Sequence, residues 1–280
     1  MPVLAVQARN AAVTGVGLRA RLRDGVLDSV TPNRRVTVIT GGSRGIGAAT
    51  ALRLATEGHD LLLVYRKDAE AARRTAARAA NLGAGCHITQ ADVSCEQQVE
   101  AMFAVALETY GFITGLVNNA GVTVHVGDLA DTPVDAIRRV VDVNLMGTIL
   151  CSRQAARLMS TRRGARGGAI VNVSSAAASV GAPHEYVHYA AAKAGVEALT
   201  VGLARELAGE GIRVNAVAPG TVATGIHADA GDPERASRVA RRIPMRRVGR
   251  ADEIAAAIVW LLSAQSSYAT GAVVRVAGGL

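Results

Sequence analysis

The sequence predicts an α/β protein with one doubly wound parallel sheet over residues 34–280. From about residue 36 onwards, short apolar runs alternate with longer helical stretches, an order typical of a parallel sheet covered by helices on both faces. A glycine-rich loop at residues 40–47 follows the first apolar run and precedes an Ala-rich helical stretch. Because ligands of such folds bind outside the carboxyl ends of the strands, we expect the functional residues in the loops that follow them.

Apolar patterns place the individual elements. The predicted strands are residues 36–39, 61–65, 87–91, 115–118, 169–173, 213–217 and 272–276. Helices are expected to end near residues 58, 82, 110 and 159, and two more are expected over residues 188–210 and 251–263. Two helix starts carry capping signals: Ser94 to Gln97 fits a capping box, and Thr132 with Pro133 fits an N-cap and the first helical position.

The composition agrees with one large domain. Half of the 280 residues are hydrophobic but only 3% are aromatic, so we expect an aliphatic core dense in Ala and Gly. No run approaches the roughly 20 apolar residues of a membrane helix, and Cys86, Cys95 and Cys151 lack the spacing of metal ligands. We therefore expect no membrane association, no metal site, and a cytoplasmic protein with buried thiols.

A formal charge of +8 can indicate binding to nucleic acid. Here much of the excess lies in an Arg-rich stretch before residue 36, and the basic runs at 162–166 and 241–250 contain no interleaved aromatic residues. We expect solvated surface there and no nucleic-acid partner. Residues 1–33 show no strong period; a mobile extension, an additional hairpin, a start codon assigned too early and an organellar presequence all stay open for this segment.

The glycine-rich loop has the context of a phosphate site. It reads Thr40-Gly41-Gly42-Ser43-Arg44-Gly45-Ile46-Gly47 and joins a strand to a helix. Glycines permit positive backbone angles and allow a pyrophosphate to approach the helix N-terminus, where unpaired N–H groups favour negative charge. The loop therefore predicts binding of a dinucleotide.

Tyr189 and Lys193 stand four positions apart in a predicted helix, so their side chains share one face. Lowering a phenol from a pKa of about 10 to ~7 requires roughly 4 kcal/mol. A cation about 4 Å away, at an effective dielectric constant near 20, supplies about that much. The pair therefore predicts a phenol that exchanges a proton at neutral pH.

Together these motifs resemble the short-chain dehydrogenase/reductase family. The chain carries the family's TGxxxGxG loop, Asn118-Asn119-Ala120-Gly121, a serine before a YxxxK motif, and Pro219-Gly220, in the family's order. The resemblance covers about residues 34–280. It implies a Rossmann fold and transfer of a hydride between a nicotinamide dinucleotide and a ketone or alcohol.

Four catalytic residues follow from this resemblance. Ser175 would orient the substrate carbonyl and Tyr189 would give it a proton. Lys193 would lower the pKa of the phenol and hold the nicotinamide ribose, and Asn144 would shape its helix to hold a water that links Lys193 to solvent. Ser174 competes with Ser175, since neighbours in a strand point to opposite faces; the family usually uses the second serine of such a pair, so we choose Ser175.

The resemblance also implies a set of cofactor-binding residues. Asp92 would accept a hydrogen bond from the adenine amine, Val93 would pack near the ring, and the loop after the sixth strand would clamp the nicotinamide through the backbone of Val222 and through Thr224. Residues 225–250 fit a substrate lid. The full predicted set is Gly41, Ser43, Arg44, Gly45, Ile46, Gly47, Arg66, Asp92, Val93, Asn119, Ala120, Gly121, Tyr189, Lys193, Pro219, Gly220, Val222 and Thr224.

The end of the second predicted strand favours NADPH over NADH. An acidic residue at this position accepts hydrogen bonds from an adenosine 2′-hydroxyl, but here Arg66 and Lys67 precede the first carboxylate, Asp68. Arg44 adds a guanidinium from the glycine loop. Each charge-assisted hydrogen bond to a phosphate contributes roughly 1.5–3 kcal/mol, so we expect NADP(H) as the cofactor.

The substrate and the assembly are less constrained. A 3-oxoacyl-thioester reductase is favoured by the basic run at 162–166, which could meet an acidic carrier protein, and a glucose-type sugar dehydrogenase by Glu185-Tyr186. A non-catalytic dinucleotide-sensing regulator is the alternative outside the enzyme class, although such proteins typically lack the Tyr/Lys pair. Tyr186 is expected to pack in the core or an interface. Small residues at 190–195 make one helix face slim, and the resemblance implies a homotetramer or homodimer.

Overall fold

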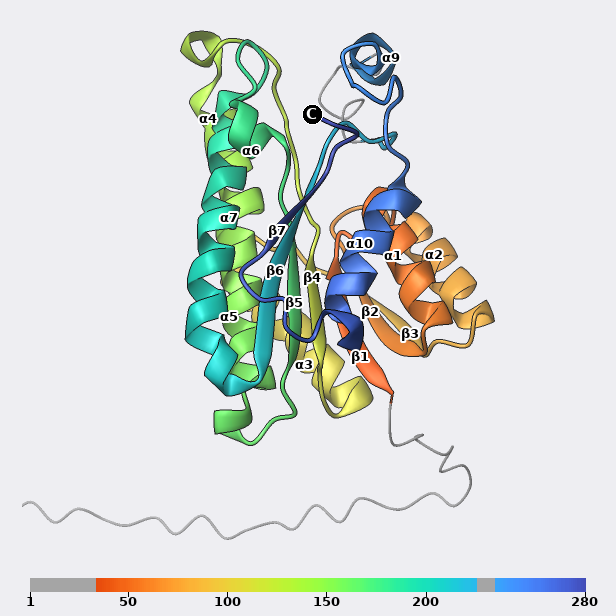
Figure 1. The fold of residues 1–280 in the computed structure, drawn as a ribbon. Coiled ribbons are helices and arrows are strands. Elements are labelled where there is room, and N and C mark those ends of the chain that lie inside the picture. The colour runs from red at the N-terminus through yellow and green to blue at the C-terminus, as the bar shows by residue number, and fades with distance from the viewer. Residues whose placement is uncertain (1–33, 226–234) are drawn as a thin grey trace, which may run out of the picture. The chain divides into compact units, whose positions relative to one another are not determined.

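The computed structural model of the protein describes residues 34–225 and 235–280. These residues form one parallel sheet with the strand order β3-β2-β1-β4-β5-β6-β7 (Figure 1). The predicted doubly wound α/β fold is confirmed. The strands are β1 Arg35–Thr40, β2 His59–Tyr65, β3 Cys86–Gln90, β4 Gly115–Asn118, β5 Gly168–Val173, β6 Ile212–Pro219 and β7 Val273–Val276.

The strand order reverses direction between β1 and β4. The chain runs outward from β1 to β3, returns to pair β4 with β1 on the other side, and then continues outward to β7. Strands β1 and β4 are parallel, so the loops that follow them leave the same edge of the sheet. These two loops then run in opposite directions, because β1 leads to β2 on one side and β4 leads to β5 on the other. This edge is where α/β sheets bind their ligands. The topology therefore predicts a ligand site at the two loops, residues 41–47 and 119–128.

Helices cover both faces of the sheet. The face with α1 Gly45–Thr56, α2 Ala69–Asn81 and α10 Ala251–Leu262 buries one apolar cluster that includes Ile39 and Leu63. The face with α3 Glu96–Tyr110, α5 Gly147–Met159 and α7 Val187–Leu207 buries the other, around Phe103 and Ile170. Shorter elements complete this part of the chain: α4 Val134–Val141, α6 Ala177–Val180 and α9 Arg235–Ala240, with single turns η1 Leu129–Asp131, η3 Thr161–Arg163, η4 Ala208–Glu210 and η5 Ala264–Ser266.

Both predicted capping signals are wrong in detail. Helix α3 is capped at Cys95 without a side-chain bond, because the Ser94 hydroxyl donates to Asp92 Oδ1 at 2.6 Å instead. Helix α4 begins one residue later than expected, with Pro133 as its N-cap, while Thr132 Oγ1 donates to the carbonyl of Asp128 at 2.9 Å. In both cases the side chain is oriented by donating its O–H to a nearby acceptor, and its oxygen does not accept from the first N–H groups of the helix.

The long helix predicted to end near residue 159 contains a π-helical turn. Helix α4 continues through η2 Asp142–Met146, which is π-helical, directly into α5. Single π-turns inside α-helices frequently occur at functional sites, and this one contains Asn144. Residues 1–33 and the part of the expected lid at 226–234 lie outside the described residues.

Candidate active site

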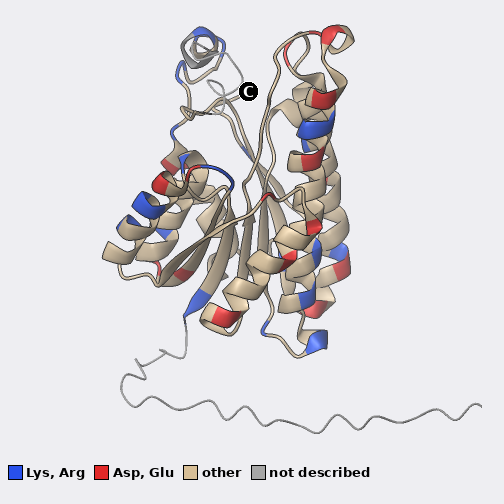
Figure 2. Ribbon diagram, turned by 180° about the vertical axis from the view of Figure 1, so that it is seen from behind, with Lys and Arg blue, Asp and Glu red and all other residues tan. Residues whose placement is uncertain are grey.

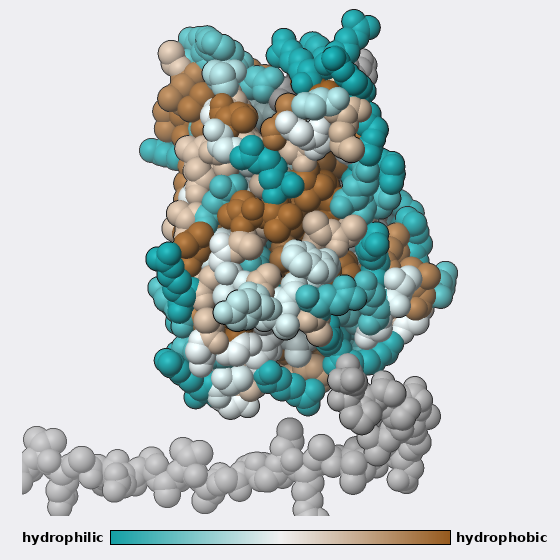
Figure 3. Space-filling view, in the orientation of Figure 1, coloured by the Kyte–Doolittle hydropathy of each residue, from teal (hydrophilic) through white to brown (hydrophobic). Residues whose placement is uncertain are grey.

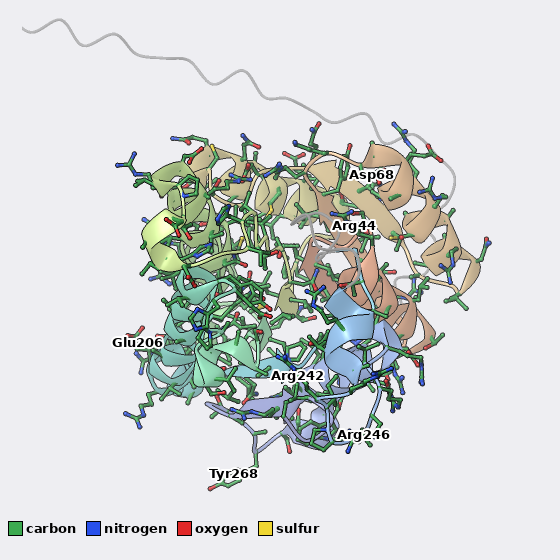
Figure 4. All side chains as sticks on the ribbon, turned by 90° about the horizontal axis from the view of Figure 1, so that it is seen from above. Arg44, Asp68, Glu206, Arg242, Arg246 and Tyr268 are labelled. Atoms are coloured by element: carbon green, nitrogen blue, oxygen red, sulfur yellow. The ribbon has the colours of Figure 1, made fainter. Side chains whose placement is uncertain are left out.

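The carboxyl edge of the sheet opens into a cleft with a volume of about 750 Å³. Figure 4 looks onto this edge and shows Arg44 and Asp68 on the side of α1 and α2. Most residues predicted from the sequence line the cleft, from the glycine loop through Arg66, Asp92, Val93 and residues 119–121 to Ser175, Tyr189, Lys193 and residues 219–224. Gly47 and Asn144 do not line the cleft, but each contacts a residue that does: Gly47 lies against Gly41, and Asn144 is hydrogen-bonded to Val122.

The glycine loop has a conformation that requires glycine at several positions, because the backbone at Gly47 approaches the backbone at Gly41 closely. Gly41 and Gly45 have φ angles of +64° and +55°, which favour glycine. A Cβ on Gly47 would lie 2.3 Å from the carbonyl oxygen of Gly41, so this position excludes a side chain. Arg44 is the N-cap of α1 and its side chain does not bond to the first helical N–H groups, which leaves this helix end suited to an anion.

Thr40 and Asn119 fasten the two loops to each other. Thr40 Oγ1 accepts hydrogen bonds from the backbone N–H groups of Asn119 at 3.0 Å and Ala120 at 3.1 Å. Asn119 Nδ2 donates to the carbonyls of Thr40 and Gly41, both at 3.0 Å. The role of Thr40 was missed in the site predicted from the sequence; its place at the end of β1, directly before the glycines, is the only signal of it.

Where the cleft reaches the ends of β2 and β3, Asp92 forms ion pairs with two arginines. Its Oδ2 lies 2.9 Å from Arg139 Nη2 and 4.0 Å from Arg66 Nη1, and its Oδ1 accepts from the backbone N–H and hydroxyl of Ser94. The expected bond from Asp92 to an adenine amine would therefore have to compete with these partners. Arg139 was not predicted, because nothing in the local pattern of α4 places it beside a loop 47 residues away.

Tyr189 is the third residue of α7, in its first turn, and is only 8% exposed. Its ring meets the ring of Tyr186 edge-on, with centroids 5.3 Å apart. Burial raises the pKa of the phenol above its usual value, and the hydrogen bond with Ser175 opposes this shift. The phenol is therefore protonated at neutral pH.

Lys193 is buried one turn further along α7. Its Nζ donates to the carbonyl of Val173 at 2.7 Å and lies 5.7 Å from the centroid of the Tyr189 ring. Burial lowers the pKa of this ammonium to about 8. The predicted acidification of Tyr189 by Lys193 is not found in this geometry, because the ammonium is directed at the end of β5 and desolvation of the phenol dominates.

Ser174 and Ser175 face opposite sides of the end of β5, as strand alternation requires. Ser174 is buried, and its hydroxyl lies 2.8 Å from Glu197 Oε1 and 3.3 Å from the carbonyl of Lys193. Ser175 lines the cleft, bonds with Tyr189, and accepts from the N–H of Ala177 at 3.1 Å. The structure thus brings the chosen serine, and not its neighbour, to the phenol.

Asn144 binds the loop that follows β4. Its Nδ2 donates to the carbonyls of Val122 at 2.8 Å and Val140 at 2.9 Å, while its Oδ1 accepts from the N–H of Val122 at 3.3 Å. A Cβ on Gly121 would lie 2.8 Å from Asn144 Oδ1 and 3.7 Å from Lys193 Nζ. Asn144 and Lys193 therefore approach the same glycine from two elements.

Comparison with known proteins shows the family of the chain. A family described as enoyl-(acyl carrier protein) reductase matches residues 41–280. The uncharacterized oxidoreductase YgfF of Escherichia coli is 45% identical over 87% of this chain and 99% of its own. The chain is a short-chain dehydrogenase/reductase. It is also similar to 3beta-hydroxysteroid dehydrogenase 1 of Eggerthella lenta, with 41% identity over 88% of this chain and 93% of that protein.

Among solved structures, this short-chain dehydrogenase/reductase resembles levodione reductase. The two share 37% sequence identity with a TM-score of 0.81, over 88% of this chain and 96% of that one. In this chain, the loop that follows β6 is fixed at both sides: Thr221 and Ala223 pair with Gly249 by hydrogen bonds of 2.9 Å, and Thr224 Cγ2 would lie 3.3 Å from a Cβ on Gly45.

The part of the cleft beyond Ser175 and Tyr189 is mainly apolar. It is lined by Val122, Val124, Ala177, Val180, Ala182, Tyr186 and Leu280, with Thr123 and Glu185 as polar members. Tyr186 is buried in an apolar cluster, as expected from the sequence, and it lines the cleft as well. His188 is buried without a hydrogen-bond partner for either ring nitrogen, and burial lowers its pKa.

Proposed function

We propose that this short-chain dehydrogenase/reductase interconverts an apolar cyclic ketone and its secondary alcohol with NADP(H), using Tyr189 as the acid and base. The observation that carries this proposal is the meeting of the Tyr189 phenol with the Ser175 hydroxyl inside the cleft. These are the only hydroxyls needed to hold and protonate a carbonyl oxygen. General acid catalysis of this kind contributes roughly 10²–10⁴-fold to a rate.

The backbone of the glycine loop supports binding of a dinucleotide in the cleft. The positive φ angles at Gly41 and Gly45 and the side-chain-free position of Gly47 leave room for a pyrophosphate at the start of α1. Residues 119–121, 219–222 and Thr224 also line the cleft, as does Lys193, which would hold the ribose. When bound, the nicotinamide supplies or accepts the hydride.

The charges at the end of β2 support NADP(H). Arg66, Lys67 and Arg44 all line the cleft. The first carboxylate after β2, Asp68, caps α2 by accepting from the N–H of Ala71 at 2.9 Å, so it is engaged away from a ribose hydroxyl. A 2′-phosphate would meet guanidinium groups here and no unpaired acid.

The proton chemistry follows from the burial of the phenol. A Tyr189 that is protonated at neutral pH donates its proton to the carbonyl oxygen, while Ser175 donates a second hydrogen bond to that oxygen. In the opposite direction the phenolate must accept the proton of the alcohol. Because burial raises the pKa of Tyr189, we expect ketone reduction to dominate near neutral pH and alcohol oxidation to increase with rising pH.

The walls of the cleft support an apolar ring as the substrate. A sugar would leave several hydroxyl groups facing valine and leucine side chains without hydrogen-bond partners, and each polar group buried in this way costs binding free energy. The names of a hydroxysteroid dehydrogenase and a levodione reductase among the similar proteins agree with a ketone on a ring system.

The basic run expected to meet a carrier protein lies at the wrong edge of the sheet. It directly precedes the amino end of β5, where Arg162 pairs with Glu210 at 3.5 Å and Arg166 stacks 3.9 Å above the ring of Phe112. The cleft opens at the carboxyl edge. In the ribbon of Figure 2, the positions of basic and acidic residues are mixed along the helices, and the described residues form no continuous basic stripe in this view.

The test is Tyr189→Phe, assayed with NADPH against a panel of cyclohexanone derivatives, acetoacetyl thioesters and sugars. Loss of one hydroxyl should lower kcat by several orders of magnitude, while the Kd for NADPH stays within about twofold. Tyr268→Phe removes the same group at a fully exposed position and should retain wild-type turnover. Full activity of Tyr189→Phe would favour the dinucleotide-sensing alternative. A preference of the wild type for thioesters or sugars would exclude a cyclic ketone as the substrate, but it would not contradict the role of Tyr189.

Two separate apolar surfaces support a homotetramer. Val134, Val141, Met146 and Val187 are exposed along α4, η2 and α7. Figure 3 shows a second apolar band over β7, where Val273 is exposed, and Trp260 of α10 and Tyr268 are exposed nearby in the chain. Two isologous interfaces produce a tetramer with dihedral symmetry; a monomeric mass by light scattering would contradict it.

A further inference from the structure

Val124 adopts a strained backbone conformation in the cleft wall. Its φ angle is +38°, and the N–H of His125 donates to the carbonyl of Thr123 at 2.6 Å across it, which closes a tight three-residue turn of the rare type with positive φ. Among the described residues with positive φ, Val124 is the only β-branched one. A β-branched residue there is a genuine outlier.

Both ends of this turn are fastened to other elements. On one side, Asn144 bonds to both the N–H and the carbonyl of Val122. On the other side, the N–H of Gly127 donates to the carbonyl of Glu185 at 2.8 Å, and Asp128 Oδ1 lies 2.8 Å from His184 Nδ1. The surrounding structure therefore holds the conformation of Val124 in place.

Core packing does not explain why a valine occupies this position. Its side chain is 46% exposed and belongs to none of the apolar core clusters. It lines the cleft, as do Val180 and Leu280, which are 59% and 40% exposed. Strain that is maintained without a packing benefit occurs at sites of function, and exposed apolar groups around a cleft indicate a ligand surface.

We propose that Val124 is a specificity-determining residue, whose isopropyl group packs on the apolar part of the substrate beside the reacting carbonyl. This inference rests on the proposed function, since it assigns one wall of the same substrate site. The turn presents the side chain to the cleft, and the anchored ends prevent the loop from relaxing away from the substrate. Selectivity among ketones is then obtained at the expense of stability.

The experiment compares Val124→Gly with Val124→Ala. Glycine accepts a positive φ without strain, so Val124→Gly should raise Tm or leave it unchanged. Alanine keeps a Cβ and the strain, so Val124→Ala should not raise Tm. Both lose the two methyl groups, and for the cyclohexanone derivative that the wild type reduces best, KM should increase about 10-fold or more in both, with kcat and the Kd for NADPH within about twofold.

Leu82→Ala is the control, because Leu82 is an exposed apolar residue at the end of α2 that does not line the cleft and lies outside both apolar surfaces assigned to the tetramer; it should leave KM unchanged. A lower Tm for Val124→Gly, or an unchanged KM in both Val124 variants, would overturn the proposal and leave the function of Tyr189 untouched. If the wild type reduces thioesters or sugars but no cyclic ketone, both the substrate class and the role of Val124 are overturned.

Discussion

At the scale of single residues, the proposed preference for NADP(H) depends mainly on Arg66. Arg66 stands at the end of β2, 4.0 Å from Asp92, and Arg139 lies 2.9 Å from the same carboxylate oxygen. Asp92 therefore keeps Arg66 close to the cleft while its own charge is neutralised by Arg139. If Arg66 turned towards a phosphate, Asp92 would keep its ion pair with Arg139.

Replacing Arg66 should change the nucleotide preference. Arg66→Ser removes a charge-assisted bond to a 2′-phosphate, so kcat/KM with NADPH should fall about 10–100-fold, whereas kcat/KM with NADH should change less than about threefold. Steady-state kinetics with both nucleotides provide the measurement. Arg78→Ser removes an equal charge from the exposed last turn of α2 and should affect neither; an equal loss with both nucleotides in Arg66→Ser would argue against a phosphate contact.

At the scale of elements, the reactive groups depend on how α7 is seated against the end of β5. Lys193 Nζ bonds to the carbonyl of Val173, and the Ser174 hydroxyl faces both Glu197 and the backbone of Lys193. These contacts place Lys193 and Ser175 at the same end of the strand. The Ser174–Glu197 bond is thus a structural support for the site, although neither residue touches the phenol.

This contact between α7 and β5 should contribute measurably to stability. Because Glu197 is partly buried and the bond is charge-assisted, Glu197→Ala should lower the free energy of unfolding by about 1–3 kcal/mol. In a double-mutant cycle by urea unfolding, Ser174→Ala should add little to Glu197→Ala. Glu206→Ala, an exposed acid on the same helix, serves as the control and should be nearly neutral. Additive losses from Ser174 and Glu197 would contradict the coupling.

For the whole molecule, stability in acid should depend on a histidine far from the cleft. His59 begins β2, is buried, and its Nδ1 lies 2.9 Å from Thr37 Oγ1 of β1. Burial, assisted by the charge of Arg35, lowers its pKa to about 4 from an ordinary value of 6.5. Between these pH values the unfolded chain binds a proton that the folded chain excludes.

Stability should therefore be fully present above pH 6.5 and should decline as the pH falls towards 4. The contribution of His59 corresponds to about 3 kcal/mol across that interval. Urea unfolding at pH 7, 5.5 and 4.5 would measure it, and His59→Gln should flatten the dependence relative to the wild type. His87→Gln, at an exposed position, should preserve the wild-type slope; a slope that His59→Gln leaves unchanged would exclude this origin.

The sequence by itself determined the fold class and the local motifs of this protein. Strand and helix periods, the glycine loop and the Tyr189–Lys193 spacing are properties of contiguous residues, and β4 has the predicted limits, Gly115–Asn118. The first residues of helices α3 and α4 were predicted less well, because the hydroxyls of Ser94 and Thr132 donate to acceptors outside these helices and do not cap them.

Only the tertiary structure decided how the site residues are paired. The bond of Lys193 to Val173, the arginines on Asp92 and the positive φ of Val124 depend on residues that approach each other from different elements. The raised pKa of Tyr189 likewise results from burial in the assembled fold. Spacing along a helix can place a phenol and an ammonium on one face, but the electrostatic environment of that face is produced by the elements packed against it.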